Sequence, residues 1–559
     1  MRSNFPTKKH TIIGGGIIGL MEAYAFYLEA KKSNEQTRIT IYEKNHTLDQ
    51  TTTSNIFPSL TPDEILSVVP RGLELVKKLK VLFSDAGGIR VDDVKGVESA
   101  ASERFNQSAL EYSKDDAAHA AREKALLSMG ELSMRLWQEM YDTADDELKK
   151  ILEDSNFNPC REPRKEGPLA LHDGYRIDLI SDIPNANDKA ESMKKDYEKL
   201  EFKHCKVLSP SEVLAMDPYL AHFCEQHSEL NHAGKHVWKK DASALFRPGG
   251  CIDTNVFLPK FQAYLTNVMG KYTNNAGTEK DYFRLKFAKK VTGIIYNKEA
   301  KHTIDGLSFF DDHIKYNKRA YSSSDYVFCP GEAVGTLSHL GFNEPDYAGF
   351  AGASLRLDIP VPESKRAEYS TLNHCMEVHK EGVVLAWQAR FKNDSVTIGV
   401  AGTKAYYGDQ TPNITQDFAK NRNLLQLNAI NQIYPQQISS VLMKETKDKE
   451  LTADDLSFLE SKNIAKRWVG VRAVAYDGVP TLGALYHNSE KVDNARTTTS
   501  LGSGGCSFAP AAVAISRSAK STSGMSEMKY TPTMFQPTAP ADEVLTQTVL
   551  RYGSSLRRA

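Results

Sequence analysis

The chain has 559 residues, too many for one simple core, and its 40% hydrophobic and 25% charged residues are ordinary for a soluble globular protein. Its 70 lysines and arginines nearly balance its 71 aspartates and glutamates, which argues against a polyanionic partner such as nucleic acid. The seven cysteines form no Cys-x-x-Cys pair, which favours free thiols in a reducing compartment and a cytoplasmic location.

The first predicted element is a short β-strand that runs into a glycine-rich turn and a helix. The stretch "HTIIGGGIIGLMEAYAFYLEAKK" contains the pattern Gly14-x-Gly16-x-x-Gly19, and apolar residues follow at helical spacing. In such a unit Gly14 allows the tight turn, Gly16 lets the backbone approach a pyrophosphate, and Gly19 lets helix and strand pack closely. The phosphate would lie at the helix N-terminus, against backbone N–H groups such as those of Ile17 and Ile18.

The same stretch has one competing interpretation, a secretory signal or a membrane anchor. Lys8, Lys9 and His10 precede the apolar run, as charged residues do in a signal peptide. Four glycines and Glu22 interrupt the run where it should be most hydrophobic, so the nucleotide-binding interpretation is favoured. No segment reaches the roughly 18 uninterrupted apolar residues of a membrane span.

A second predicted strand, "RITIYEKN", ends at an acidic residue. Glu43 lies 24 residues beyond Gly19, near the position at which a dinucleotide-binding unit places the acid that accepts hydrogen bonds from a ribose. An acid at this point favours an unphosphorylated ribose, as in FAD or NAD, over NADP. Lys44 follows directly and belongs to the same predicted site.

The next part of the chain predicts a helical insertion and then a histidine-rich segment. Residues 61–154 carry apolar side chains at helical spacing, which fits either packing against the nucleotide-binding domain or a partner-binding face. Four histidines and a cysteine between residues 222 and 236 invite a zinc site. Only four residues separate His227 from His232, too few for a usual paired-knuckle loop, so a polar surface segment without metal is expected.

Seven segments carry strands, glycine turns and helices that together form a signature. In chain order they are "TTTSNIFPSL", "CKVLSPSEVLAMDPYL", "ALFRPGGCIDTNVFLPKFQAYL", "KFAKKVTGIIYN" with "SSDYVFCPGEAVGTLSHLG", "VVLAWQARFKNDSVTIGVAGT", "RWVGVRAVAYDGVPTLGALY" and "TTTSLGSGGCSFAPAAVAIS". This order resembles the D-amino-acid oxidase superfamily of FAD-dependent amine oxidoreductases, which includes glycine oxidase, sarcosine oxidase and D-amino-acid dehydrogenase. The resemblance covers most of the chain and implies FAD, rather than NAD, as the cofactor.

The resemblance also implies which residues surround the cofactor. The loop after the second strand would pass the pyrophosphate and the flavin, Val291 would contact adenine, and Gly331 would end a strand beside the flavin. A closing turn at 502–505 would aim backbone N–H groups at the flavin N1–C2=O edge, where a reduced flavin gathers negative charge. The implied cofactor-binding residues are Gly14, Gly16, Ile17, Ile18, Gly19, Glu43, Lys44, Thr53, Ser54, Asn55, Val291, Gly331, Gly502, Ser503, Gly504 and Gly505.

Two arginines are the catalytic candidates on the substrate side. In "RWVGVRAVAYDG", Arg472 matches the family arginine that pairs with the substrate carboxylate, which a guanidinium does through two parallel hydrogen bonds. Arg390, near the end of a predicted substrate-domain strand, is the second candidate. The alternative for Arg472 is a structural salt bridge, and the alternative for Arg390 is an exposed or structural arginine. Trp387, Tyr406 and Tyr407 fit either the substrate pocket or the core.

The activity that the resemblance implies is oxidation of the C–N bond of a small amino acid or an N-methyl amino acid. The substrate would give a hydride to flavin N5, and water would hydrolyse the resulting imine. No general base is required, because a neutral amine delivers the hydride from its α-carbon. The electron acceptor stays open between oxygen, a quinone and a protein.

Departures from the family pattern leave a second function open. Ala473 stands in place of a proline, Ala401 in place of a glycine and Pro330 in place of a small residue. The alternative is a flavin-binding protein with lost or altered chemistry that acts as an interaction module through its insertion. Oxidation of a modified tRNA nucleoside is disfavoured by the neutral charge balance. Covalent flavin attachment at Cys506 is also considered, but a buried free thiol is favoured.

The expected fold is α/β with two domains. A doubly wound, Rossmann-like FAD-binding domain would be assembled from the discontinuous segments 8–60, 245–345 and 470–525. A substrate domain with a mixed or antiparallel sheet would comprise part of 155–244 together with 346–469. The helical insertion (61–154) and a C-terminal tail of unassigned role (526–559) complete the chain.

Overall fold

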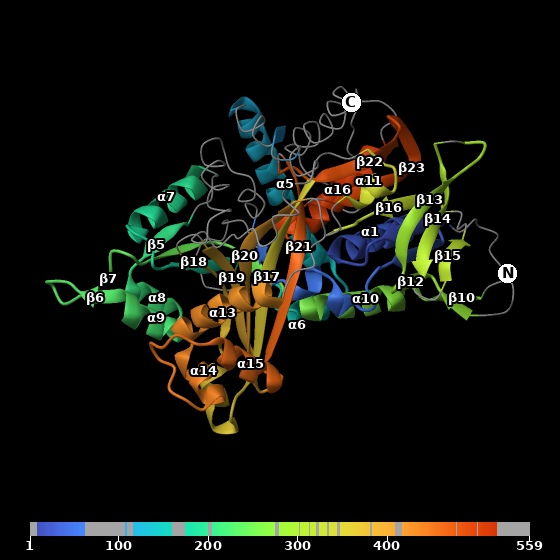
Figure 1. The fold of residues 1–559 in the computed structure, drawn as a ribbon. Helices are drawn as coiled ribbons and strands as arrows, with labels where there is room; N and C mark the ends of the chain where they lie inside the picture. Colours follow the sequence, from blue (N-terminus) through green and yellow to red (C-terminus); the bar gives the residue numbers. More distant parts are fainter. Residues whose placement is uncertain are drawn as a thin grey trace.

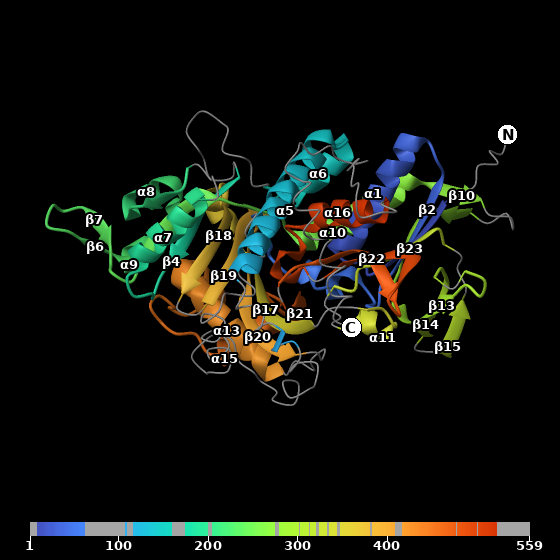
Figure 2. The same ribbon diagram turned by 90° about the horizontal axis from the view of Figure 1, so that it is seen from above.

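The computed structural model describes most of the chain (Figures 1 and 2). The described residues are 8–61, 105, 107–108, 116–158, 174–199, 204–273, 279–300, 302–311, 314–319, 323–331, 335–343, 347–380, 383–408, 416–476, 478–499 and 501–521. The predicted C-terminal tail and residues 62–104 of the predicted insertion lie outside this set.

Six strands from distant parts of the chain form one sheet, seen on the right of Figure 1. In spatial order they are β12 (Phe283–Lys286), β2 (Thr37–Tyr42), β1 (Lys8–Ile13), β16 (Asp325–Phe328), β23 (Glu490–Thr499) and β22 (Thr481–His487). The first five are parallel, and β22 pairs antiparallel with β23. Short apolar runs form the central strands because a parallel sheet is covered on both faces.

Helices cover one face of the six-stranded sheet, and strands cover the other. The helices are α1 (Ile17–Ser33), α10 (Thr254–Met269) and α16 (Ala509–Ser521). The strands are β13 (Lys290–Tyr296), β14 (Ile304–Asp311) and β15 (Ile314–Arg319), which form an antiparallel sheet of their own. Ile12 and Val327 pack under the helices, whereas Tyr42 and Phe328 pack under β13 and β14. The small sheet therefore takes the place of one helical layer of a doubly wound fold.

The strand order of this sheet reverses at β1. From β1 the chain places β2 on one side, and it later returns to place β16 on the other. The loops that leave the carboxyl ends of β1 and β16 therefore diverge. Open α/β sheets bind their ligands at such a switch point, so the topology predicts a ligand site at this edge.

A second, eight-stranded sheet forms the other half of the molecule, with β17, β19, β20 and β21 near the centre of Figure 1. In spatial order its strands are β21 (Ala465–Ala475), β17 (Tyr347–Pro360), β20 (Ser395–Gly408), β19 (Val383–Lys392), β18 (Asn373–Lys380), β4 (Tyr175–Ile180), β8 (Ser243–Pro248) and β5 (Lys206–Leu208). Only β18 and β4 are parallel neighbours. The predicted α/β class, with one parallel sheet from discontinuous segments and one mixed sheet, is confirmed.

The two faces of the eight-stranded sheet differ in chemistry, because successive side chains of a strand point to opposite sides. One face is apolar, with residues such as Leu355, Trp387 and Ile398, and packs under α13 (Gln416–Ile433), α14 (Pro435–Leu442) and α15 (Ala453–Ser461). The opposite face, which we call the polar face, carries arginines, carboxylates, a glutamine, a tryptophan and small residues. Its members are Arg176, Asp178, Arg247, Gly352, Ser354, Arg356, Glu377, Gln388, Arg390, Gly399, Trp468, Gly470 and Arg472.

The described part of the predicted insertion is helical and packs on the six-stranded half. It forms α5 (Asp116–Thr143) and α6 (Asp146–Asp154), which contact α16 and α10 respectively. The Ser133 hydroxyl and the Trp137 indole N–H both donate to the carbonyl of Ser507, at 2.5 and 3.2 Å. The insertion thus holds the segment that leads into α16.

The acid that interrupts the first apolar run has a structural partner. Glu22 is fully buried within α1, and its carboxylate accepts hydrogen bonds from the Arg496 guanidinium and, at 3.1 Å, from the Thr498 hydroxyl. Both partners lie on β23. A buried charge is tolerated when it is paired in this way, so Glu22 fastens the N-terminal helix to a strand near the other end of the chain.

The predicted domain limits cut through two strands of the eight-stranded sheet. The limit at residue 245 falls inside β8, and the limit at 470 falls inside β21. The division into domains stays a prediction. None of the helices that the structure describes combines the length and the hydropathy that a bilayer crossing needs.

Candidate functional site

The glycine-rich turn lies at the switch point of the six-stranded sheet. Gly14 follows β1 with φ +108°, and a side chain there would overlap the carbonyl oxygen of Cys329, which follows β16. A side chain at Gly19 would overlap the Gly14 carbonyl, so α1 packs directly on the turn. Both positions therefore require glycine, for the reasons expected from the sequence.

The N-terminus of α1 begins at a glycine. Gly16 is its N-cap residue, and no side chain caps it and no acid occupies its first turn. A Cβ at Gly16 would meet only the Thr53 hydroxyl, at 3.1 Å, and that oxygen lies 3.4 Å from the Ile17 amide nitrogen. The side chain of Ile17 is buried in the core. The first-turn N–H groups form a cradle that suits a phosphate.

Glu43 is buried beside this cradle. Its two carboxylate oxygens accept backbone hydrogen bonds, one from Gly15 at 2.7 Å and the other from Asn45 at 2.9 Å. The carboxylate is thus held at the end of β2, against Gly15 of the glycine-rich turn. The side chain of Lys44 is exposed.

The predicted residues in the loop after β2 have two different roles. Ser54 is buried, and its hydroxyl donates to the Leu48 carbonyl at 2.6 Å. The Asn55 amide donates to the carbonyls of Asp49 and Thr51. These two side chains therefore shape the loop itself. Thr53 alone directs its hydroxyl toward the α1 N-terminus.

Two more glycine turns reach the same edge of the sheet, because they follow strands parallel to β1. Gly331 comes after β16 with φ +60°. The 3-10 turn η5 (Gly502–Gly505) comes after β23, and Gly502 has φ +55°. Val291 lies elsewhere, buried in β13 in the cluster that includes Ile13 and Tyr42. Cys506, which follows η5, is completely buried.

The segment after Asn55 crosses the polar face of the eight-stranded sheet. The Ser354 hydroxyl donates to the Asn55 carbonyl at 2.5 Å, and the Gln388 amide donates to the carbonyls of Pro58 and Ile252 at 3.2 and 3.1 Å. The ring of Phe57 lies on Gly399, where a side chain would overlap it. The polar face and the nucleotide-type loops therefore form one continuous region.

The two candidate arginines have different surroundings on this face. Arg390 pairs with Asp253, the N-cap residue of α10, and donates to the Asp154 carbonyl at 3.2 Å. Its guanidinium thus joins β19 to α10 and α6, which is the structural alternative. Arg472 is partly buried on β21, the strand that contacts η5, and lies against Gly352.

Of the three aromatic candidates, the structure describes the side chain of Trp387. Trp387 is buried on the opposite, apolar face, with its ring 6.0 Å from that of Tyr434. The side chains of Tyr406 and Tyr407 lie outside the described part of the molecule. A different aromatic residue, Trp468, shares the strand and the face of Arg472. The alternation in "RWVGVR" contains this information, although the sequence interpretation did not use it.

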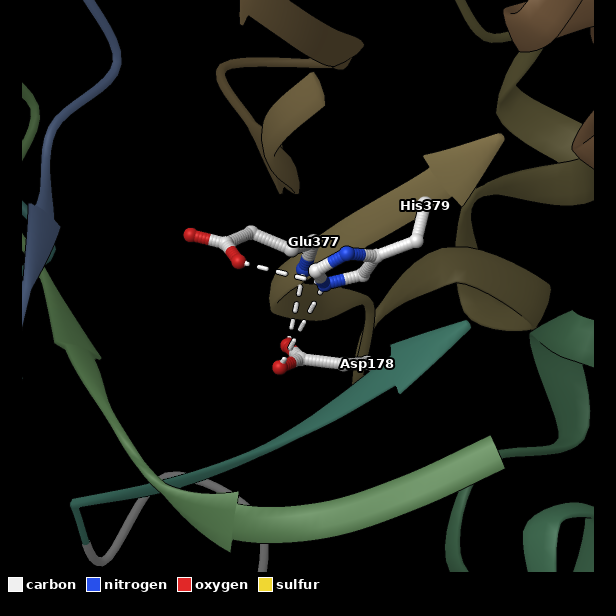
Figure 3. Close-up of side chains that lie close together, drawn as sticks. All are labelled: Asp178, Glu377 and His379. Atoms are coloured by element: carbon white, nitrogen blue, oxygen red, sulfur yellow. Dashed lines mark hydrogen bonds and ion pairs between the residues drawn. The ribbon is translucent and has the colours of Figure 1, made fainter. Parts of the chain in front are cut away.

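A buried charge cluster occupies the far end of the polar face (Figure 3). Arg176 bonds to Asp178 and Glu377, both at 2.9 Å, and Arg247 bonds to the same two carboxylates. The His379 ring nitrogen lies 3.3 Å from Glu377 and 3.9 Å from Asp178. Arg176 also donates to the Ser59 hydroxyl, so the cluster holds the segment that crosses this face.

The protonation of this cluster follows from its pairing. Burial alone would raise the pKa of Glu377, but Arg176 and His379 together outweigh burial and lower that pKa to about 2. Burial lowers the pKa of His379, but its hydrogen bonds to Asp178 and Glu377 outweigh burial and hold the pKa above its ordinary value. Burial raises the pKa of Asp178, but two guanidiniums contact its carboxylate, and this geometry favours a set of paired charges.

The same cluster has the residue types of a metal site. One ligand atom each from Asp178, Glu377 and His379 lies within 4.8 Å of the others. Two buried guanidiniums already balance the two carboxylates, however, so a divalent cation would add uncompensated charge.

In the histidine-rich segment, Cys224 is buried and points to the Pro210 carbonyl, and the His236 ring lies 3.2 Å from the Ser228 hydroxyl.

No protein-family model matches the sequence, and no curated protein matches it. Solved structures of several oxidases have a similar fold at low sequence identity. Glycine oxidase from Geobacillus kaustophilus is 14% identical over 91% of this chain and 92% of its own, with a TM-score of 0.49. Iminodiacetate oxidase from Chelativorans sp. BNC1 is 13% identical over 91% and 94%, with a TM-score of 0.46. Fructosamine oxidase from Aspergillus fumigatus is 9% identical over 92% and 86%, with a TM-score of 0.48. Function has to be argued from this chain's own residues.

Proposed function

We propose that this protein is an FAD-dependent oxidoreductase that oxidises the C–N bond of an amino acid or an N-methyl amino acid. One observation carries the proposal. A dinucleotide-type cradle and the η5 glycine turn lie at one edge of the six-stranded sheet, and η5 contacts the strand that carries Arg472. A carboxylate anchor beside a cofactor site is what such a reaction needs.

The residues at the switch point fit FAD. The uncapped N-terminus of α1 suits the pyrophosphate, and the Glu43 carboxylate suits the hydroxyls of an unphosphorylated ribose. The η5 turn would offer backbone N–H groups to negative charge. When bound, FAD supplies the hydride acceptor that no amino-acid side chain can provide.

The polar face supplies substrate binding. Arg472 would hold the substrate carboxylate by two parallel hydrogen bonds and so fix the position of the adjacent α-carbon. Arg390 would keep the structural role that its pairing with Asp253 gives it. We further propose that the six-stranded half binds the cofactor and the eight-stranded sheet binds the substrate.

Glu43→Gln is expected to weaken FAD binding by about tenfold. Each carboxylate oxygen accepts one backbone N–H, and a glutamine would turn its amide nitrogen toward one of those donors, leaving it unsatisfied. The measurement is the Kd of the apoprotein for FAD. Glu35→Gln is the control, since Glu35 pairs with Lys8 on the surface, and its Kd should not change. An unchanged Kd for Glu43→Gln would exclude Glu43 from the site.

Anaerobic mixing of the purified holoprotein with D-, L- and N-methyl amino acids tests the function as a whole. One member of the panel is expected to bleach the visible flavin band, and readmitted air or an added quinone then identifies the electron acceptor. If the band is present and no member bleaches it, the amino-acid assignment fails and the interaction-module alternative replaces it. If the protein binds no flavin, the cofactor assignment fails as well.

A further inference from the structure

β21 carries a tryptophan and an arginine on one side of the eight-stranded sheet. Trp468, Gly470 and Arg472 alternate along this strand, so all three belong to the polar face. On the neighbouring strand β17, Gly352 lies directly opposite Gly470. The two opposed glycines leave a strip of bare backbone between the two long side chains.

Both long side chains lie on this strip. A Cβ at Gly470 would overlap the Trp468 indole, and a Cβ at Gly352 would lie 2.6 Å from the Arg472 Nη1. Opposed Cβ positions in paired strands are about 5 Å apart, so the indole and the guanidinium lie side by side within about 10 Å. A ligand whose carboxylate pairs with Arg472 would have the indole as its next neighbour.

The indole of Trp468 is not used by the fold in the way that the other tryptophans are. Trp137 and Trp238 donate hydrogen bonds to backbone carbonyls, and Trp387 packs its ring on Tyr434. Trp468 is only partly buried, and among the described residues no hydrogen bond or ring contact engages its indole. The Cη2 edge of the indole lies on Gly470, and the partly exposed ring surface is therefore left for a ligand.

We propose that Trp468 determines substrate specificity and selects a carboxylate with a large, planar, uncharged side chain. The proposal rests on the proposed function, since it takes Arg472 as the carboxylate anchor. The neighbouring guanidinium repels a second cation, so the indole face suits a neutral aromatic group better than an ammonium group. The substrate is thus a bulky aromatic amino acid, and the smallest amino acids are poor ligands.

Calorimetric titration of the holoprotein with propionate and 3-phenylpropionate tests this inference. The two probes share the carboxylate and differ by one aromatic ring. We expect 3-phenylpropionate to bind at least about tenfold more tightly, since a ring stacked on an indole gains roughly that factor beyond area burial. Trp468→Ala should reduce this preference to about twofold, and Trp468→Phe should keep most of it.

Gly470→Ala is a second variant that keeps the tryptophan but displaces its ring, because the added Cβ occupies the ring's place. It should also reduce the preference, and it keeps the test valid if Trp468→Ala does not fold. Trp238→Phe is the matched control, with the preference unchanged. The inference alone is overturned if Trp468→Ala and Gly470→Ala both keep the full preference for 3-phenylpropionate while Arg472→Ala still weakens the binding of both probes. If Arg472→Ala weakens neither probe, the proposed function and this inference both fail.

Discussion

Arg472→Ala is expected to raise the KM for the substrate by about 100-fold while the purified protein keeps its bound FAD. A bidentate pair between a guanidinium and a carboxylate in a partly buried site contributes about 3 kcal/mol, and each 1.4 kcal/mol is a factor of ten. Arg472 lies on the polar face against Gly352, whereas the pyrophosphate and the ribose are assigned to α1 and Glu43, so the loss should fall on substrate binding. Steady-state kinetics together with the absorbance ratio of flavin to protein measure both quantities.

Two variants sharpen the Arg472 experiment. Arg472→Lys keeps the charge and loses the planar fork, so an intermediate rise in KM, about tenfold, is expected. Arg467→Ala is the matched control: Arg467 is on the same strand but on the opposite face, where it pairs with Glu460. Its KM should equal that of the wild type. An unchanged KM in Arg472→Ala would remove Arg472 from the substrate site.

Asp178→Asn is expected to lower the free energy of unfolding by about 4 kcal/mol. The side chains of Arg176 and Asp178 are completely buried, and Arg247 nearly so. The substitution leaves two guanidiniums and one histidine against a single carboxylate, and removing one partner of a buried charge pair typically costs about 3–5 kcal/mol. Urea unfolding followed by tryptophan fluorescence measures the change.

A surface carboxylate on the same sheet provides the control for Asp178. Asp358 pairs with Arg356 at 3.1 Å but is more than a quarter exposed, so Asp358→Asn should cost less than about 1 kcal/mol. Equal losses in the two variants would show that the stability of the cluster does not depend on its buried charges. Loss of Asp178 should also loosen Ser59, which Arg176 holds, and so lower the affinity for FAD.

Local patterns in the sequence predicted the strand–helix–strand unit near the N-terminus, while the cofactor assignment of its residues stays a prediction. The glycine spacing and the distance from Gly19 to Glu43 depend on one strand–helix–strand unit, whose geometry is set within about 35 residues. The structure gives Gly14, Gly19 and Glu43 the steric and hydrogen-bonding roles that this unit requires. It also shows that Ser54 and Asn55 support their own loop, a distinction that motif order does not contain.

The substrate side could not be predicted equally well, because it depends on pairings between distant strands. Asp253 and Arg390 are 137 residues apart, so no local pattern indicated that Arg390 has a partner. The charge cluster joins three strands whose alternating charged residues are visible only after the sheet is assembled. Trp468 lies on Gly470, and Arg472 lies on Gly352, which is opposite Gly470 on another strand.

The fastening of α1 to β23 has a consequence for the biosynthesis of the protein. Glu22 cannot pair with Arg496, and β16 cannot pair with β23, until almost 500 residues have been translated. Contacts of such long sequence separation form late, after the local helices and hairpins. A ribosome-bound chain therefore exposes an incomplete nucleotide fold for most of its synthesis. If FAD binds at the switch point as proposed, its capture is a late event, and prematurely terminated chains would not carry flavin.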